Sequence, residues 1–142
     1  MRLGGQHGIM CSIDLCAVSA YNQYMNATQW NKSAQVAHEA TERAASTADP
    51  SLAIADLAEA SRAIEGALQE AMAAAVLAGV SMRKVAEIAG MAPNSVPSRL
   101  ARSTPLSGYT SGGTVTADMI AVARHDAATG RGPMTFTPRR KD

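Results

Sequence analysis

The spacing of apolar and polar residues divides most of the chain into helical segments. Over the first segment, small and aromatic residues recur at steps of three and four, as expected for one face of a helix: Trp30, Ala34, Ala37, Ala40 and Ala44. This pattern predicts a helix over residues 28–46. The preceding residues show no clear periodicity, so 1–27 are expected to form a flexible N-terminal arm, with a short helical turn near 14–24.

A second helical pattern runs over residues 50–78, and Asp49 is suited to cap it. Pro50 fits the first helical position, where its missing N–H costs nothing. Gly66 is a weak point at which the helix could kink or split. The apolar positions follow a seven-residue repeat: Leu57, Ile64 and Ala71, with Leu68 and Ala75 interleaved. Such a stripe is either an intramolecular packing face or a dimer seam. Residues 28–78 are therefore assigned to packing or dimerisation.

Two shorter helices are predicted on either side of Gly90. Gly79 closes the long helix, and Ser81 can cap the next one. If Gly90 is a turn glycine, Ala86 lies where the two helices cross, and a larger side chain there would hold them apart. The remaining apolar residues have the spacing of inward-facing anchors: Val85, Ala89, Met91, Val96 and Leu100.

The stretch LAGVSMRKVAEIAGMAPNSVPSRLAR, residues 77–102, resembles the helix-turn-helix segment of bacterial and phage DNA-binding proteins. The resemblance covers 26 residues and identifies no subfamily. It implies a helix-turn-helix over about 79–104, whose first helix contacts the DNA backbone and whose second helix enters the major groove. The implied DNA-contacting residues are, on the first helix, Ser81, Arg83 and Lys84 and, on the second, Asn94, Ser95, Ser98, Arg99 and Arg102. Arg can pair with guanine and Asn with adenine, while Arg and Lys on phosphates add affinity without sequence information.

Pro97 departs from the family pattern, because a polar residue facing DNA usually stands at this position. Proline inside a helix costs about 3 kcal/mol, but almost nothing in the first turn, where the N–H has no helical partner. The second helix is therefore predicted to start one or two residues late, with Asn94 as its N-cap. Asn94 would then divide its side chain between capping and base contact, and base reading would move toward Ser98, Arg99 and Arg102.

The last segment, residues 105–142, mixes turn and helix signals. A small β-hairpin is expected over 106–116 around Gly112 and Gly113, followed by a helix over 117–128. Thr116 caps this helix, Gly130 ends it, and its predicted buried face comprises Met119, Ile120 and Ala123. A short strand over 134–137 and a solvated basic tail over 139–141 close the chain. The predicted fold is mainly α: a multi-helix bundle with a helix-turn-helix and a small C-terminal β-hairpin.

The charge distribution favours a polyanionic partner for the second half of the chain. Residues 1–80 hold four basic and eight acidic side chains, a net charge of −4, whereas residues 81–142 hold nine basic and four acidic ones, a net charge of +5. Only 4% of residues are aromatic and alanine is abundant, so the core is thin and a helical dimer would enlarge it.

Several function classes find no support in the sequence. His7, Cys11 and Cys16 have no fourth ligand at a zinc-site spacing, so no metal or cofactor is expected. There is no glycine-rich phosphate loop, nucleophile motif or paired carboxylate, so the protein is not expected to be an enzyme. The apolar run at 9–20 is too short to span a membrane, and a reduced cytoplasmic setting fits best.

The resulting hypothesis is a homodimer that binds double-stranded DNA sequence-specifically. It would be a transcriptional regulator, such as a repressor, or a maintenance factor of a plasmid, phage or other mobile element, and would join the nucleoid when bound to DNA. The alternative is a helical adaptor or assembly protein that binds a protein partner through its long alanine-rich helices.

Overall fold

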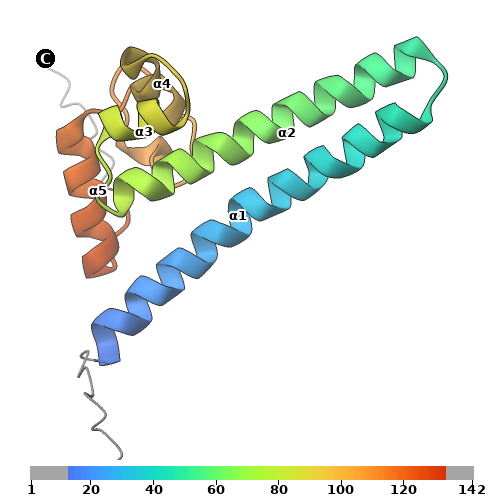
Figure 1. Cartoon of the computed structure of the whole chain (residues 1–142). Coiled ribbons are helices and arrows are strands. Elements are labelled where there is room, and N and C mark those ends of the chain that lie inside the picture. The colour runs from blue at the N-terminus through green and yellow to red at the C-terminus, as the bar shows by residue number, and fades with distance from the viewer. Residues whose placement is uncertain (1–12, 134–142) are drawn as a thin grey trace, which may run out of the picture.

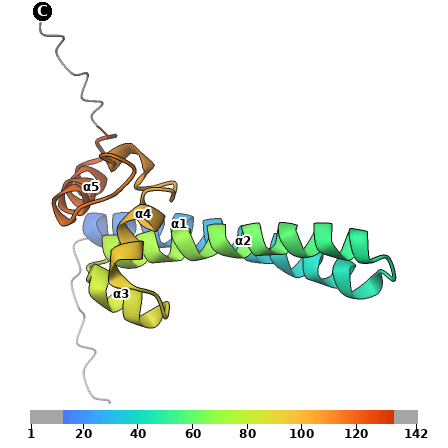
Figure 2. The ribbon, with the colours of Figure 1, turned by 90° about the horizontal axis from the view of Figure 1, so that it is seen from above.

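The fold was analysed in a computed structural model, which describes the backbone of residues 13–133 and the side chains of residues 29–133. It is mainly helical, and the elements follow one another in this order: α1 (Ile13–Ser46), α2 (Pro50–Leu77), α3 (Met82–Ile88), a 3₁₀ turn (Pro93–Ser95), α4 (Val96–Leu100), a second 3₁₀ turn (Ser107–Tyr109) and α5 (Ala117–Thr129). Helices α1 and α2 form a long antiparallel hairpin. Residues 78–133, here called the headpiece, gather around the C-terminal end of α2 (Figures 1 and 2).

The long hairpin begins earlier than the sequence pattern indicated. Helix α1 starts at Ile13 rather than near residue 28, in keeping with the small cost of extending a helix once it has formed. Residues 1–12 of the expected arm lie outside the described residues. The start of α2 is as predicted, since the Ser51 N–H donates a 2.8 Å hydrogen bond to Asp49 Oδ1 and Pro50 occupies the first turn. Helix α2 continues through Gly66 without a break.

Alanines hold α1 against α2. Away from the headpiece, the buried side chains of the hairpin are Ala37, Ala40 and Ala60, which let the two helices approach closely. Large apolar side chains are left outside this contact, and Leu57 and Ile64 of the predicted stripe are both more than half exposed. Farther along the same stripe, Leu68 packs against the headpiece core. The stripe is therefore an intramolecular packing face only in its C-terminal half.

The main hydrophobic core lies where the headpiece meets α2. Its buried residues come from α2, α3, α4, the following loops and α5: Met72, Ala73, Val76, Val85, Ala86, Val96, Leu100, Leu106, Val115, Ile120 and Ala123. The predicted limits of the last helix are confirmed. The Met119 N–H donates to Thr116 Oγ1 at 3.3 Å, and Gly130 ends α5 in the left-handed conformation.

The predicted C-terminal hairpin is not found between residues 13 and 133, which contain no β-strand. Gly112 and Gly113 form a tight turn with positive φ, and Ser111 and Thr114 exchange backbone hydrogen bonds of 3.0 and 3.2 Å across it. No ladder extends from this single bridge. The next hydrogen-bonded pair would be Tyr109 and Thr116, but the Tyr109 N–H donates to the Leu106 carbonyl at 3.0 Å and Thr116 is the N-cap of α5. The expected strand at 134–137 and the basic tail at 139–141 lie outside the described residues.

Candidate nucleic-acid interface

The turn between α3 and α4 is built around Gly90. The Lys84 N–H donates to Ser81 Oγ at 3.2 Å, so Ser81 caps α3 as predicted. At the other end, Gly90 has a φ of +64°, and the Met91 N–H returns 3.0 Å to the Ala86 carbonyl. This closing pattern satisfies carbonyls that would otherwise be left free at the end of the helix, and it needs glycine because of the left-handed backbone.

Of the side chains predicted to face inward, all but Ala89 do so; Ala89 is half-buried and lies outside the core. Val85 and Ala86 on α3 and Val96 and Leu100 on α4 are buried, and Met91 packs against the same core. Because both helices are anchored on α2 by these residues, α3 and α4 form one unit with a defined outer surface.

Pro97 occupies a position where it costs little. Helix α4 begins at Val96, so Pro97 is its second residue and its missing N–H would have had no helical partner. The late start of the helix is confirmed, but the assignment of Asn94 as its N-cap is wrong. Residues 93–95 form a 3₁₀ turn, in which the Ser95 N–H bonds the Ala92 carbonyl at 2.9 Å. Ser95 takes the cap position, no side chain caps α4, and Asn94 is exposed.

The predicted DNA-contacting residues differ in how accessible they are. Five are exposed and three half-buried; the exposed ones are Ser81, Arg83, Lys84, Asn94 and Arg102, and the half-buried ones are Ser95, Ser98 and Arg99. Some of their polar groups are already engaged within the protein. The Ser81 hydroxyl caps α3, the Ser98 hydroxyl donates to the Ser95 carbonyl at 3.1 Å, and Lys84 Nζ lies 2.9 Å from Glu87 Oε1.

A carboxylate on α2 that the sequence reasoning missed holds two of these residues. Arg99 donates a 3.2 Å hydrogen bond to Glu65 Oε1, and Arg102 Nη1 lies 4.0 Å from the same oxygen. The side chains of Arg99 and Glu65 are 34% and 46% exposed, so the pair is within reach of solvent. Because Glu65 and Arg99 are 34 positions apart in the sequence, no local pattern could reveal the contact.

Other contacts fix the headpiece on α2. The carboxylate of Glu70 accepts hydrogen bonds from the backbone N–H of Thr104 at 2.7 Å and from its hydroxyl at 2.8 Å. Arg124, one of the basic residues in the positive half, instead donates two hydrogen bonds to the Val76 carbonyl near the end of α2. The guanidinium group of Arg124 satisfies a carbonyl at the end of α2, and its positive charge interacts favourably with the negative end of the helix dipole. The basic residues of the headpiece are thus divided between structural and outward-facing roles.

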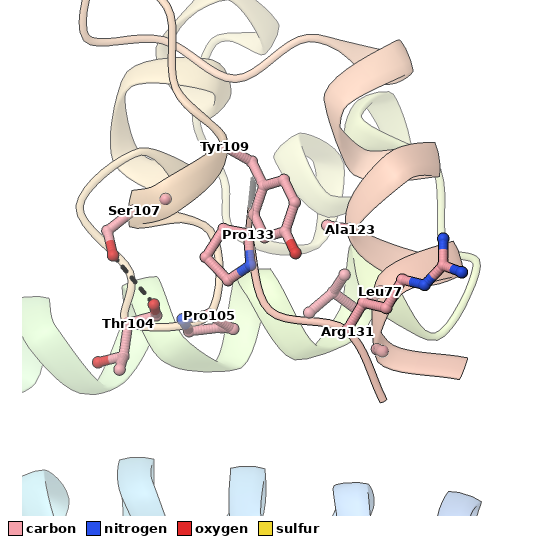
Figure 3. A pocket seen from close by; sticks show the side chains of 10 residues that line it. Leu77, Thr104, Pro105, Ser107, Tyr109, Ala123, Arg131 and Pro133 are labelled. Atoms are coloured by element: carbon pink, nitrogen blue, oxygen red, sulfur yellow. Dashed lines mark hydrogen bonds between the residues drawn. The ribbon is translucent and has the colours of Figure 1, made fainter. Parts of the chain in front are cut away.

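An open hollow of about 370 Å³ lies elsewhere on the headpiece, between α5, the second 3₁₀ turn and the end of α2 (Figure 3). None of the eight predicted DNA-contacting residues lines it. Tyr109 stands at its wall and donates a 3.0 Å hydrogen bond to the buried carboxylate of Asp126. Burial, followed by this hydrogen bond and the negative charge, raises the pKa of Tyr109. The hollow brings together no nucleophile and base.

Comparison with known proteins gives no match among family models, curated proteins or solved structures. Within the described residues, no group of three or more His, Cys, Asp or Glu side chains is placed to hold a metal ion. None of the helices of residues 13–133 is long and apolar enough to cross a lipid bilayer. The side chains of His7, Cys11 and Cys16 lie outside the described part of the chain.

Proposed function

We propose that this protein is a homodimeric, sequence-specific DNA-binding protein that inserts α4 into the major groove of double-stranded DNA. Its biological role would be transcriptional regulation or the maintenance of a plasmid or phage. The supporting observation is the unit formed by α3, the Gly90 turn and α4, in which Val96 and Leu100 are buried, Ser98 and Arg99 are half-buried, and the flanking Asn94 and Arg102 are exposed.

The proposed reading surface comprises Ser98 on α4 and the exposed residues that flank the helix, Asn94 in the preceding 3₁₀ turn and Arg102 in the following turn. Ser98 lies on the side of α4 away from Val96 and Leu100. Asn94 has no capping role to compete with base contact. Arg102 carries the longest polar side chain of this surface and is suited to guanine or phosphate.

Positive charge on α3 would place the protein on the DNA backbone. Arg83 and Lys84 are exposed beside the capped start of the helix. Each phosphate contact releases counterions and contributes affinity that falls steeply with salt. One reading helix buries too little surface for tight specific binding, whereas a twofold dimer reads two half-sites.

The test is binding of genomic duplex fragments by the full chain, followed by salt titration on a selected site. The variant Arg99→Ala/Arg102→Ala is expected to weaken binding at least about tenfold. The slope of log affinity against log salt concentration is expected to become shallower by up to about two. The matched control Arg43→Ala/Arg62→Ala removes two charges from the long hairpin, and its affinity and slope are expected to equal those of the parent. Equal affinity and equal slope for the headpiece variant and the parent protein would refute the assignment of α4.

A helical adaptor is the second candidate, and one observation favours it. Leu57 and Ile64 leave an apolar face uncovered on α2, as a protein-binding surface would require. An electrophoretic shift assay separates the two functions. Absence of a shift on every genomic fragment at low salt would favour the adaptor.

A further inference from the structure

An uncovered apolar strip follows α2 away from the headpiece. Here called the α2 strip, it comprises Ile54, Leu57, Ser61 and Ile64. The three large side chains are 69%, 53% and 56% exposed, respectively, whereas the buried contacts between α1 and α2 in this region are made by alanine. In Figures 1 and 2 this part of the hairpin extends beyond the headpiece, and no other described element packs on it. A two-helix hairpin that buries so little apolar surface would gain stability from another helical layer packed against this face.

The strip is also uncharged, which restricts the partner that it suits. At about 100° per residue, its four members fall within about 80° of one another around α2. Asp56 and Glu59 lie on another side of the helix, where both bond to Arg43 at 3.0 and 2.8 Å. The nearest charged neighbour of the strip on α2 is Glu65, whose carboxylate is paired with Arg99 at 3.2 Å. An apolar strip of this kind fits another apolar helix rather than a nucleic acid or an acidic peptide.

We propose that the α2 strip is covered by a second copy of this chain, so that two hairpins form an antiparallel four-helix bundle. Its two central large side chains, Leu57 and Ile64, are related to each other by a point midway between Ala60 and Ser61. In an antiparallel pair centred there, Leu57 of one copy lies opposite Ile64 of the other, and the reverse contact repeats by symmetry. Ser61 lies nearest the twofold axis, where a small side chain allows the helices to approach.

Helix α1 contributes the second layer of the bundle. On the side of α1 next to the α2 strip, helical spacing places Ala34, His38, Thr41 and Ala45, all of them exposed and all but His38 small. From Pro50 to Leu68 this face is about 27 Å long at 1.5 Å per residue and about 20 Å wide across two helices. A flat footprint of about 540 Å² approaches the roughly 800 Å² of accessible surface that each partner of a standard interface buries.

The headpieces remain free in this arrangement. Val76, in the headpiece core, lies about 100° around α2 from Leu57, so antiparallel pairing places both headpieces on one side of the bundle. If the headpiece is centred near Met72, the two copies stand about 35 Å apart along α2. That value matches one turn of DNA, the spacing of two half-sites. Only this last match rests on the proposed DNA binding; the self-association does not.

The first test is the molar mass of the full chain without DNA, by light scattering and sedimentation equilibrium. The parent is expected to be a dimer at micromolar concentration, and Leu57→Glu/Ile64→Glu to raise the dissociation constant at least about a hundredfold while keeping its helical circular dichroism. The control Val36→Glu/Leu52→Glu adds the same charges on the other side of the hairpin and is expected to stay dimeric. A monomeric parent, or a folded strip variant that dimerises like the parent, would overturn the proposal.

Cross-linking provides a test that does not depend on a destabilising substitution. In a Cys11→Ser/Cys16→Ser background, Ser61→Cys is expected to form a disulfide between copies under mild oxidation, whereas Ala55→Cys, which is exposed on the opposite side of α2, is not. Equal cross-linking at both positions, or none at Ser61→Cys, would refute the arrangement. Because no DNA is present, a dimer that fails to bind DNA would refute only the proposed function.

Discussion

The contact between Glu65 and two headpiece arginines makes a specific prediction about DNA affinity. Substitution of Glu65 by Gln keeps the size and hydrogen-bonding capacity of the side chain but removes its negative charge. Arg99 and Arg102 would then no longer have to leave an ion pair to reach DNA. We therefore expect Glu65→Gln to bind duplex DNA more tightly than the parent protein.

The size of the gain follows from two contributions. The Arg99–Glu65 pair is partly exposed on both sides, so breaking it costs about 0.2–1 kcal/mol. A carboxylate about 10 Å from a phosphate adds about 0.4 kcal/mol of repulsion in water. Their sum, about 1 kcal/mol, corresponds to an increase in affinity of about fivefold.

The assay is fluorescence anisotropy with a labelled duplex at low salt, repeated at about 200 mM salt, where screening should shrink the gain. Glu59→Gln is the matched control, because Glu59 is also on α2 and pairs with an arginine, Arg43, but lies in the hairpin away from the headpiece. Its affinity is expected to equal that of the parent. Unchanged or weaker binding by Glu65→Gln, or an equal gain in Glu59→Gln, would show that the Glu65 contact does not restrain the reading arginines.

Three further predictions concern the headpiece itself. Leu100 is fully buried, so Leu100→Ala should lower the free energy of unfolding by about 2–5 kcal/mol in urea titrations. The control Leu52→Ala, at an exposed position, should change it little. A small loss for Leu100→Ala would contradict the place of Leu100 in the core. Gly90→Ala should cost about 1–2 kcal/mol in the same assay through its positive φ alone, since an added Cβ meets no atom within 4 Å. Because the pKa of Tyr109 is raised above its unfolded value of about 10, its contribution to stability is complete below that pH and is lost as pH rises through the folded pKa. The free energies of unfolding of the parent and of Tyr109→Phe, measured against pH, should therefore converge at alkaline pH. Parallel curves would show that the ionisation of Tyr109 is not coupled to stability.

Features with a local cause were predictable from the sequence. The caps at Asp49, Ser81 and Thr116 form as expected, because each side-chain acceptor needs only an N–H two or three residues away. The turn at Gly90 and the inward side chains around it follow from short-range spacing and from glycine's freedom to adopt positive φ. The late start of α4 followed from the geometry of Pro97, although Ser95 rather than Asn94 takes the cap position.

Features that depend on which elements meet were decided by tertiary structure. The pattern that predicted an apolar stripe on α2 could not say that Leu68 would be covered and Leu57 left exposed. Away from the headpiece, only alanines are buried between α1 and α2. The expected C-terminal hairpin is reduced to one bridge because Tyr109 bonds Leu106 in a 3₁₀ turn and Thr116 caps α5, so neither continues the ladder. Helical periodicity determines which side chains share a face of a helix. It does not determine which distant segment packs on that face or pairs with its charges, as Glu65 does with Arg99.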